Sequence, residues 1–247
     1  MDPTLPAYVG MAAVVFLAYT VFGLTGFGSS IVAVPILVQF VPLSFAVPLV
    51  LLFDLAATSA VGVSNWKQIS RMELLRLLPC MLIGIAIGAI ALVGVQARWL
   101  LLTLGVFVLA TATWSLVAPP ARHAIGTLWV VPAGLVGGVF SALFGTGGPI
   151  YTIYLARRIQ DAGSLRATMS AVVLISALCR LAAFAGVGLL QQDHLLLSGL
   201  WLLPACAAGV FAGSRLRGVL PPARVKQALF VVLMLGGAGA IVRALSM

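Results

Sequence analysis

Two clusters of glycine and hydroxyl side chains interrupt this otherwise apolar chain at matching places. The first lies in the segment GLTGFGSSIVAVPIL, residues 23–37, and the second lies in SALFGTGGPIYTIYL, residues 141–155. Glycine weakens a helix by about 1 kcal/mol relative to alanine, and in a bilayer an interrupted backbone persists only where protein or a wet cavity surrounds it. Paired interruptions, one in each half of a chain, are typical of the binding site of a membrane transporter.

The chemistry that these interruptions could perform is the binding of an anion. A helix that begins at membrane depth presents free N–H groups and the positive end of its dipole, which attract negative charge. Glycine lets backbone approach a ligand closely, and the hydroxyls of Ser29, Ser30 and Thr146 add donors. The candidate substrate-binding residues of the two interruptions are Gly26, Phe27, Gly28, Ser29, Gly145, Thr146, Gly147 and Gly148. The alternative is that these glycines only let broken helices pack, but two equivalent clusters favour a site.

Two ionisable residues lie inside apolar runs, at corresponding places in the two halves of the chain. Asp54 lies in the middle of the run 43–63, and Arg180 lies inside the run 167–190. An ionisable group at such depth costs at least about 2.5–3.5 kcal/mol and usually faces the protein interior or a cavity. Two interpretations remain open. Asp54 and Arg180 could neutralise each other and fix helix packing, or Arg180 could bind the anion while Asp54 carries a proton.

The composition is that of a membrane protein. The 247 residues are 62% hydrophobic and 8% charged, and their mean hydropathy is +1.20. Long apolar runs recur, and each approaches the length that a hydrocarbon core of about 30 Å requires. These runs cover residues 43–63, 74–95, 99–117, 167–190, 195–212 and 225–241, and the two interrupted segments cover about 7–41 and 125–156. We therefore expect an all-α polytopic membrane protein.

The charge pattern points to a lipid bilayer as the partner and argues against nucleic acid. The net charge is +9, but the basic residues occur singly or in pairs in short loops between the apolar runs, which is typical of the positive-inside distribution. The three cysteines all fall within apolar runs, and their spacing matches no zinc or haem motif. We expect neither a cofactor nor a bound metal.

The chain is an internal duplication. The pattern LPxxxxGxxxG occurs at Leu78-Pro79 with Gly84 and Gly88, and again at Leu203-Pro204 with Gly209 and Gly213. This spacing, together with the two interruptions, predicts repeats at 1–118 and 119–247 that form one integral membrane domain. Each repeat would contain an interrupted segment and three transmembrane helices. Small residues four apart favour close helix packing, which we prefer over a ligand role for these glycines.

The distribution of Lys and Arg favours one topology. If each interrupted segment enters and leaves on the same side, as a hairpin of two half-helices, only Arg98 and Arg243 lie opposite the other basic residues. That asymmetry is expected of a cytoplasmic face, and it makes the second repeat inverted relative to the first. If both interrupted segments cross fully, the basic residues divide between the two sides. The run 7–24 is long enough to span, which keeps this second arrangement open.

The chain resembles the TauE/SafE sulfite exporter family. The resemblance rests on GLTGFGSSIVAVPIL near the start and GLVGGVFSALFGTGGPIYTIYL at mid-chain, and it extends over essentially the whole sequence. Phe27 and Ser29 stand where further glycines often occur in the family. The resemblance implies a bacterial inner-membrane permease of four-plus-four repeat layout. It also implies export or uptake of sulfite, sulfonates or related small organic anions, coupled to protons.

These observations together predict a secondary transporter for a small sulfur-containing anion that works by alternating access. Arg180 would help to hold the anion, and Asp54 would be the proton-coupling residue. An anion channel is the alternative, because the same interrupted helices could line a pore. An intramembrane enzyme is disfavoured, because such chemistry needs several converging acids, histidines or a metal, and Asp54 is the acid expected at membrane depth.

Overall fold

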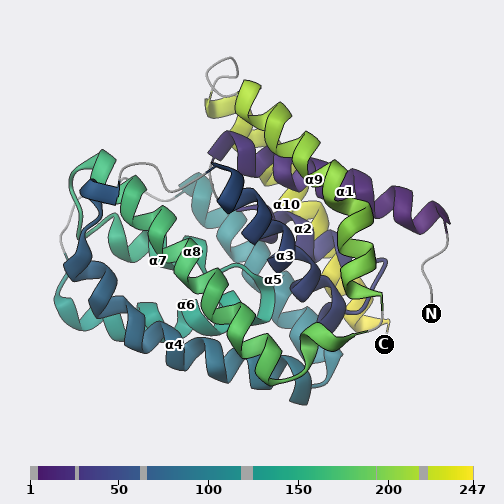
Figure 1. The fold of residues 1–247 in the computed structure, drawn as a ribbon, viewed down its shortest axis with the longest axis horizontal. Coiled ribbons are helices and arrows are strands. Elements are labelled where there is room, and N and C mark those ends of the chain that lie inside the picture. Colours follow the sequence, from purple (N-terminus) through teal and green to yellow (C-terminus); the bar gives the residue numbers. More distant parts are fainter. Residues whose placement is uncertain are drawn as a thin grey trace.

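The computed structural model describes residues 5–25, 28–61, 66–117, 125–192, 194–216 and 222–246, and within these ranges every regular element is helical (Figure 1). The predicted all-α class is confirmed. The long helices are α1 (Leu5–Thr25), α3 (Leu43–Val61), α4 (Arg71–Gly94), α5 (Ala97–Val117), α6 (Val130–Phe144), α8 (Ala162–Gly186), α9 (Leu195–Leu216) and α10 (Pro222–Leu245). The short elements are α2 (Ser29–Leu37), α7 (Gly148–Leu155) and the 3-10 turns η1 (Trp66–Gln68), η2 (Thr127–Trp129) and η3 (Leu189–Gln191).

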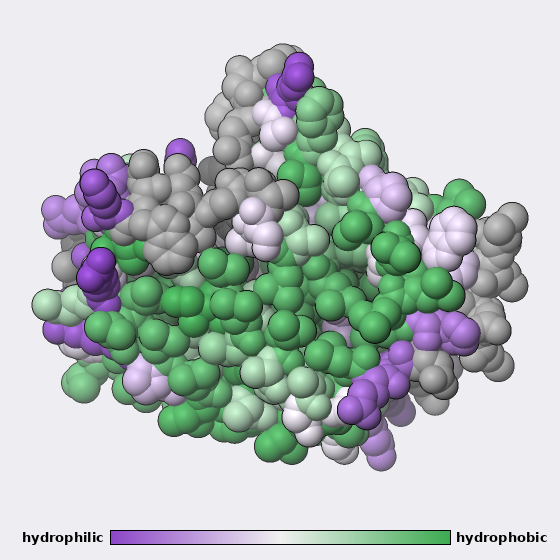
Figure 2. Space-filling view, viewed as in Figure 1, coloured by the Kyte–Doolittle hydropathy of each residue, from purple (hydrophilic) through white to green (hydrophobic). Residues whose placement is uncertain are grey.

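Seven helical segments in the described ranges are long and apolar enough to cross a bilayer. They are Ala7–Thr25, Arg71–Gly94, Ala97–Trp114, Thr127–Phe144, Ala162–Gly186, Leu195–Leu216 and Gln227–Leu245, and a shorter apolar segment covers Leu43–Ser59. Figure 2 shows that the middle of the visible face is broadly hydrophobic, whereas hydrophilic residues gather toward its edges. This pattern is that of a protein whose sides contact lipid and whose ends contact water.

Both predicted interruptions are present, but they divide their segments unequally. The first separates α1, which has 21 residues, from α2, which has 9, and the second separates α6, with 15 residues, from α7, with 8. The first member of each expected pair is not a half-helix, because Ala7–Thr25 and Thr127–Phe144 are both long enough to cross a bilayer, and only α2 and α7 are short. Before Thr25 the apolar run of α1 contains only the isolated glycines Gly10 and Gly23 as interruptions, and each costs the helix only about 1 kcal/mol, so the helix ends only at the glycine cluster that follows.

Glycine is needed at both interruptions because the backbone turns through the left-handed region there. Gly28, which precedes α2, has φ 89°, and Gly145, which ends α6, has φ 72°. Residues with a Cβ rarely adopt this conformation, which also ends many helices. Gly26 and Phe27 lie outside the described residues.

The ends of each interrupted segment lie at the same end of the molecule. Arg158, which follows α7, donates a 3.0 Å hydrogen bond from Nη1 to the carbonyl of Ile125, which precedes α6. In the first segment, Tyr8 near the start of α1 hydrogen-bonds Ser198 near the start of α9. Gln192, just before α9, donates to the carbonyl of Ser44 at the start of α3, the helix that follows α2. The start and the finish of each interrupted segment therefore lie toward the same end of the molecule.

Close helix pairs join the two halves of the chain. A Cβ on Gly88 of α4 would lie 2.7 Å from the carbonyl oxygen of Val139 and 2.8 Å from the Cβ of Ala142, both on α6. Correspondingly, a Cβ on Gly213 of α9 would lie 2.8 Å from the Cα of Gly23 on α1. The predicted packing role of these glycines is confirmed. Each half contributes helices that pack directly on helices of the other.

Basic side chains gather at one end of the helix bundle. The hydroxyl of Ser164 at the start of α8 donates a 2.7 Å bond to the carbonyl of Gln68, so η1 and the start of α8 lie together at the same end as Arg158 and Glu73. This end carries Lys67, Arg71, Arg76, Arg157, Arg158 and Arg166. Arg98 and Arg243 lie toward the opposite end, where Arg243 shares a cavity with Val95 and Ala97. Arg122 and Arg217 lie outside the described residues.

We expect reporters inserted after Lys67 and after Arg158 to read cytoplasmic in intact cells. Both sites lie at the basic end, and basic loops are retained in the cytoplasm during membrane insertion. A reporter after Arg98 is the matched control and is expected to give the opposite reading. Opposite readings at Lys67 and Arg158 would instead support the arrangement in which both interrupted segments cross fully.

Candidate functional site

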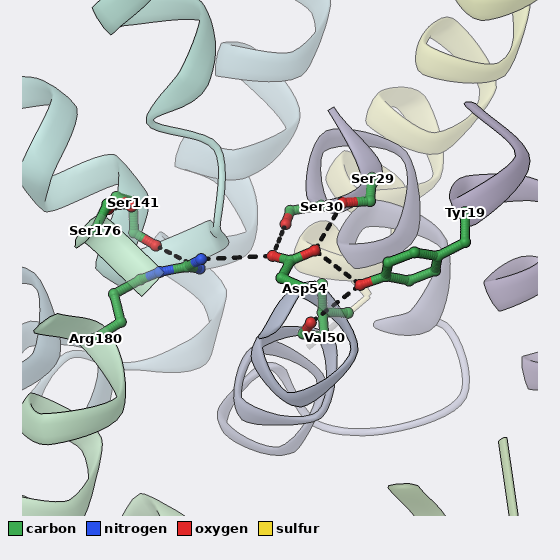
Figure 3. A network of polar contacts seen from close by, with 8 residues as sticks. All are labelled: Tyr19, Ser29, Ser30, Val50, Asp54, Ser141, Ser176 and Arg180. Carbon is green, nitrogen blue, oxygen red and sulfur yellow. Dashed lines mark hydrogen bonds and ion pairs between the residues drawn. The ribbon is translucent and has the colours of Figure 1, made fainter. Parts of the chain in front are cut away.

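A buried carboxylate lies at the beginning of α2, where the sequence predicts an anion site. Asp54 of α3 is 6% exposed, and it accepts hydrogen bonds from Ser29 Oγ at 2.7 Å, Ser30 Oγ at 2.8 Å and Tyr19 OH at 2.8 Å. Figure 3 shows these three hydroxyl side chains directed at the carboxylate. Three donors and the positive end of the α2 dipole are what stabilise a negative charge away from water. The anion bound at the start of α2 is therefore the carboxylate of Asp54.

The guanidinium of Arg180 approaches Asp54 from the other side but is held loosely. Arg180 of α8 is 3% exposed, and its Nη2 lies 3.4 Å from Asp54 Oδ2, while Nη1 lies 3.3 Å from the carbonyl oxygen of Ser141 (Figure 3). Charge-assisted hydrogen bonds are usually about 2.7–2.9 Å long. Nε of Arg180 has no hydrogen-bond partner among the described residues. Arg180 thus pairs with Asp54 and retains donor capacity for another acceptor.

The two interruptions meet at this pair. A Cβ on Gly145 would lie 2.6 Å from the Cβ of Ser30 and 3.1 Å from Nη1 of Arg180. The end of α6 therefore touches the beginning of α2, and any larger residue at position 145 would push the two segments apart. Because Gly145 also has a positive φ, both space and backbone conformation require glycine at this contact.

A small cavity of about 40 Å³ lies between the two interruptions. Its polar lining includes Asp54, Arg180, Ser176 and the hydroxyl side chains next to the glycines. A water molecule requires roughly 10–15 Å³ by this measure, so the cavity has room for a few waters or a compact ion. The cavity therefore combines a cation, a carboxylate and several hydroxyl donors in a space the size of a small anion.

The structure brings most of the predicted site residues to this cavity. The candidates that line it are Gly28, Ser29, Asp54, Gly145, Thr146, Gly148 and Arg180. Gly147 is different, because a Cβ there would lie 2.6 Å from the carbonyl oxygen of Gly137 and 2.8 Å from Cε2 of Tyr151. Gly147 thus makes room for packing behind the cavity and does not line it. The remaining candidates, Gly26 and Phe27, lie outside the described residues.

Sequence reasoning missed the hydroxyl residues that surround the charges from other helices. Tyr19 comes from α1, and Ser141 of α6 and Ser176 of α8 hydrogen-bond each other at 2.7 Å. These residues are separated from Asp54 or Arg180 by intervals that no local motif connects. Their signal in the sequence is only that a serine or tyrosine in an apolar helix needs a partner when it is buried.

A second set of ionic contacts lies at the basic end of the molecule. Glu73 of α4 accepts a 2.8 Å bond from Arg158 Nη2 and a 2.7 Å bond from Tyr154 OH of α7, and it also pairs with Arg76. The hydrogen bond from Arg158 to the Glu73 carboxylate raises the pKa of Arg158, so this cation stays charged. Since Arg158 also binds the carbonyl of Ile125, the two ends of the α6–α7 segment are tied to α4.

The opposite end of the molecule is hollow. A cavity of about 520 Å³ lies among the α2–α3 connection, the end of α4, the start of α5 and the segment between α8 and α9. Its walls are mainly apolar, and they include Gln192 and the cation Arg243. Ion pairs thus tie helices together at the basic end, while the other end contains a hollow large enough for a small organic molecule.

Comparison with known proteins supports a role in membrane transport. The sequence model of the family described as Sulfite exporter TauE/SafE matches residues 11–240. A relative from Comamonas testosteroni, described as "Probable inner membrane transporter protein TsaS", is 30% identical over 192 residues, which cover 76% of this chain and 80% of that protein. No solved structure matches the chain.

Proposed function

The chain belongs to the Sulfite exporter TauE/SafE family of membrane transporters, and from this premise we propose that it carries a small sulfur-containing anion as a proton-coupled secondary transporter. It is a multi-pass protein of the inner membrane and a transporter, not an enzyme. The proposed substrates are sulfite, an organosulfonate or a related organic anion.

The observation that carries this proposal is the incompletely satisfied Arg180 beside the cavity between the two interruptions. Its contacts with Asp54 and Ser141 are 3.4 Å and 3.3 Å long, whereas Arg158 reaches Glu73 at 2.8 Å. A buried guanidinium normally has its donors satisfied, because an unpaired buried polar group is costly. An anion in the cavity would supply the missing acceptor.

Charge balance supports proton coupling through Asp54. When Asp54 is ionised, it and Arg180 neutralise each other, and a bound monoanion would leave one uncompensated negative charge in the buried site. Such a charge costs several kcal/mol or more. Protonation of Asp54 removes that charge and leaves Arg180 to pair with the anion. We therefore propose that Asp54 takes up one proton when the site binds a monoanion.

Alternating access is supported by the unequal ends of the molecule. The ion pairs of Glu73 tie helices together at the basic end, whereas the hollow near Arg243 lies at the other. Interrupted helices in transporters let parts of the bundle move around a central site while each exposed backbone group stays within protein. Opening the basic end would require the contacts of Arg158 with Glu73 and Ile125 to break.

The test is uptake by proteoliposomes that contain the purified protein. We expect saturable uptake of at least one of sulfite, sulfoacetate, taurine and sulfate, and we expect a proton gradient that acidifies the side of the substrate to accelerate it. Preloading the vesicles with unlabelled substrate should accelerate exchange, which a carrier performs. Protein-free vesicles are the control. Non-saturating conductive flux would favour the anion channel, and no flux of any of these anions would contradict the proposal.

A further inference from the structure

We infer that Tyr151 contacts the transported anion, and that it forms with Thr146 and Arg180 a three-donor set that selects a group with three oxygen atoms on one centre, such as a sulfonate or sulfite. This inference rests on the proposed function and deepens it. The three residues come from different parts of the second half of the chain, namely the interruption, α7 and α8. All three line the same cavity of about 40 Å³.

The three residues share one property that sets them apart from the other buried polar side chains described. Thr146 Oγ1, Tyr151 OH and Arg180 Nε are the buried side-chain nitrogen and oxygen atoms in the described ranges that have no partner in hydrogen-bond geometry, although the Ser141–Ser176 pair lies close to the Tyr151 hydroxyl. Thr146 is 2% exposed and Tyr151 is 1% exposed. Almost all buried polar groups in proteins are paired, so unpaired groups that gather at one cavity are available to a ligand or to water there.

Neighbouring hydroxyl groups show that this fold can satisfy buried donors where no ligand is needed. Tyr19, Ser29 and Ser30 all donate to Asp54, and Ser141 and Ser176 bind each other. These bonds are 2.7–2.8 Å long. The unpaired hydroxyls of Thr146 and Tyr151 therefore do not reflect a generally loose interior. They are donors that the Asp54 carboxylate does not use.

Two glycines fix the position of the Tyr151 ring. A Cβ on Gly137 would lie 2.8 Å from Cδ1 of Tyr151, and a Cβ on Gly147 would lie 2.8 Å from Cε2 on the other edge of the ring. The ring is thus held between two backbone segments that have no side chain. A donor that is already held in place loses little conformational entropy when the ligand binds. This accounts for Gly147, which the cavity itself does not use.

The arrangement predicts which anions fit. Donors from Thr146, Tyr151 and Arg180 can each meet one oxygen of a tetrahedral or pyramidal group with three oxygens, when protonated Asp54 leaves the guanidinium free. A carboxylate has enough lone pairs for three donors, but its acceptor sites all lie in one plane, so donors that converge from three directions would meet it with poorer geometry. A poorly paired buried donor weakens binding by up to roughly tenfold. The preference for sulfonate over carboxylate should therefore depend on the Tyr151 hydroxyl.

The experiment compares Tyr151→Phe with wild type in proteoliposomes, with methanesulfonate, sulfite and acetate as probes. The substitution removes only the hydroxyl, and we expect the half-saturating concentration of methanesulfonate or sulfite to rise by about tenfold while that of acetate changes little. Thr146→Val should have the same effect, because it replaces a hydroxyl by a methyl group of similar size. Tyr8→Phe is the matched control, since Tyr8 contacts Ser198 outside this cavity, and it should keep wild-type selectivity.

The thermal stability of Tyr151→Phe without anion provides a second readout. The hydroxyl has no partner among the described residues, so we expect its removal to leave the melting temperature unchanged or higher. Removal of a hydroxyl that is hydrogen-bonded within the protein would instead lower the melting temperature. If Tyr151→Phe has the wild-type half-saturating concentration for every anion, this inference is wrong but the proposed function stands. Wild-type protein that takes up neither methanesulfonate nor sulfite nor any anion of the earlier uptake assay would overturn the proposed function, and this inference with it.

Discussion

Arg180→Gln is expected to abolish anion uptake, lowering the initial rate at low substrate concentration by about a hundredfold or more. Loss of one partner of a buried, hydrogen-bonded charge pair costs about 2–5 kcal/mol in binding, which corresponds to this factor. Glutamine keeps part of the side-chain volume but carries no charge. The measurement is the uptake rate of the best wild-type substrate in proteoliposomes. Arg98→Gln is the matched control, because Arg98 is exposed and lies at the end of the molecule opposite the basic end. This variant should transport normally.

The folding effect of Arg180→Gln must be separated from its effect on transport. The single substitution leaves Asp54 buried without a cation, which destabilises a protein by about 3–5 kcal/mol. In the double variant Asp54→Asn with Arg180→Gln, no charge is left unpaired at this site, and we expect its melting temperature to recover. The double variant should still fail to transport. Transport by a stable double variant would show that no guanidinium is needed, and the assignment of Arg180 would be wrong.

Asp54→Asn is expected to separate transport from its proton dependence. Asparagine can still accept from Ser29 and Tyr19 through Oδ1, and its Nδ2 can donate to the Ser30 hydroxyl instead of accepting from it. The start of α2 thus keeps polar partners, but the site becomes permanently positive through Arg180. Anion binding at neutral pH should tighten by about tenfold, within the usual range of coupling between two ligands of one protein. Exchange of internal for external anion should persist, while acceleration by an imposed proton gradient should be lost.

The comparison for Asp54→Asn is the ratio of uptake with and without a proton gradient. Glu73→Gln is the matched control. Among the described residues, Glu73 is the second buried acid, and it takes part in the ion pairs at the basic end. We expect Glu73→Gln to retain the stimulation ratio even if its absolute rate changes. If Asp54→Asn is stimulated as strongly as wild type, Asp54 is not the coupling residue.

The apolar runs and their interruptions could be predicted from the sequence because their causes are local. A run of apolar residues forms a helix at membrane depth wherever no glycine or proline cluster intervenes, since the backbone must pair with itself. The boundaries were accurate to a few residues, as for α9, predicted at 195–212 and observed at Leu195–Leu216. The start of α8 was predicted too late, at 167. The helix begins at Ala162 because the Asp161 side chain accepts from the Ser164 N–H at 2.6 Å.

The candidate site was predicted in part for the same reason. Interrupted helices with adjacent hydroxyls, and ionisable residues within apolar runs, are visible in a single sequence because both are locally unfavourable. This is how Gly28, Gly145, Asp54 and Arg180 were found. Gly147 was assigned to the site because spacing cannot tell a glycine that faces a cavity from one that faces the Tyr151 ring.

Only the tertiary structure decided which partner each of these groups has. Asp54 and Arg180 are 126 positions apart, and the Tyr19 hydroxyl reaches Asp54 across 35 positions, so no local pattern specifies either contact. The sequence likewise contains nothing that distinguishes the paired hydroxyl of Tyr19 from the unpaired hydroxyl of Tyr151. That difference arises because helix packing places the Tyr19 hydroxyl against the Asp54 carboxylate and the Tyr151 hydroxyl at the cavity.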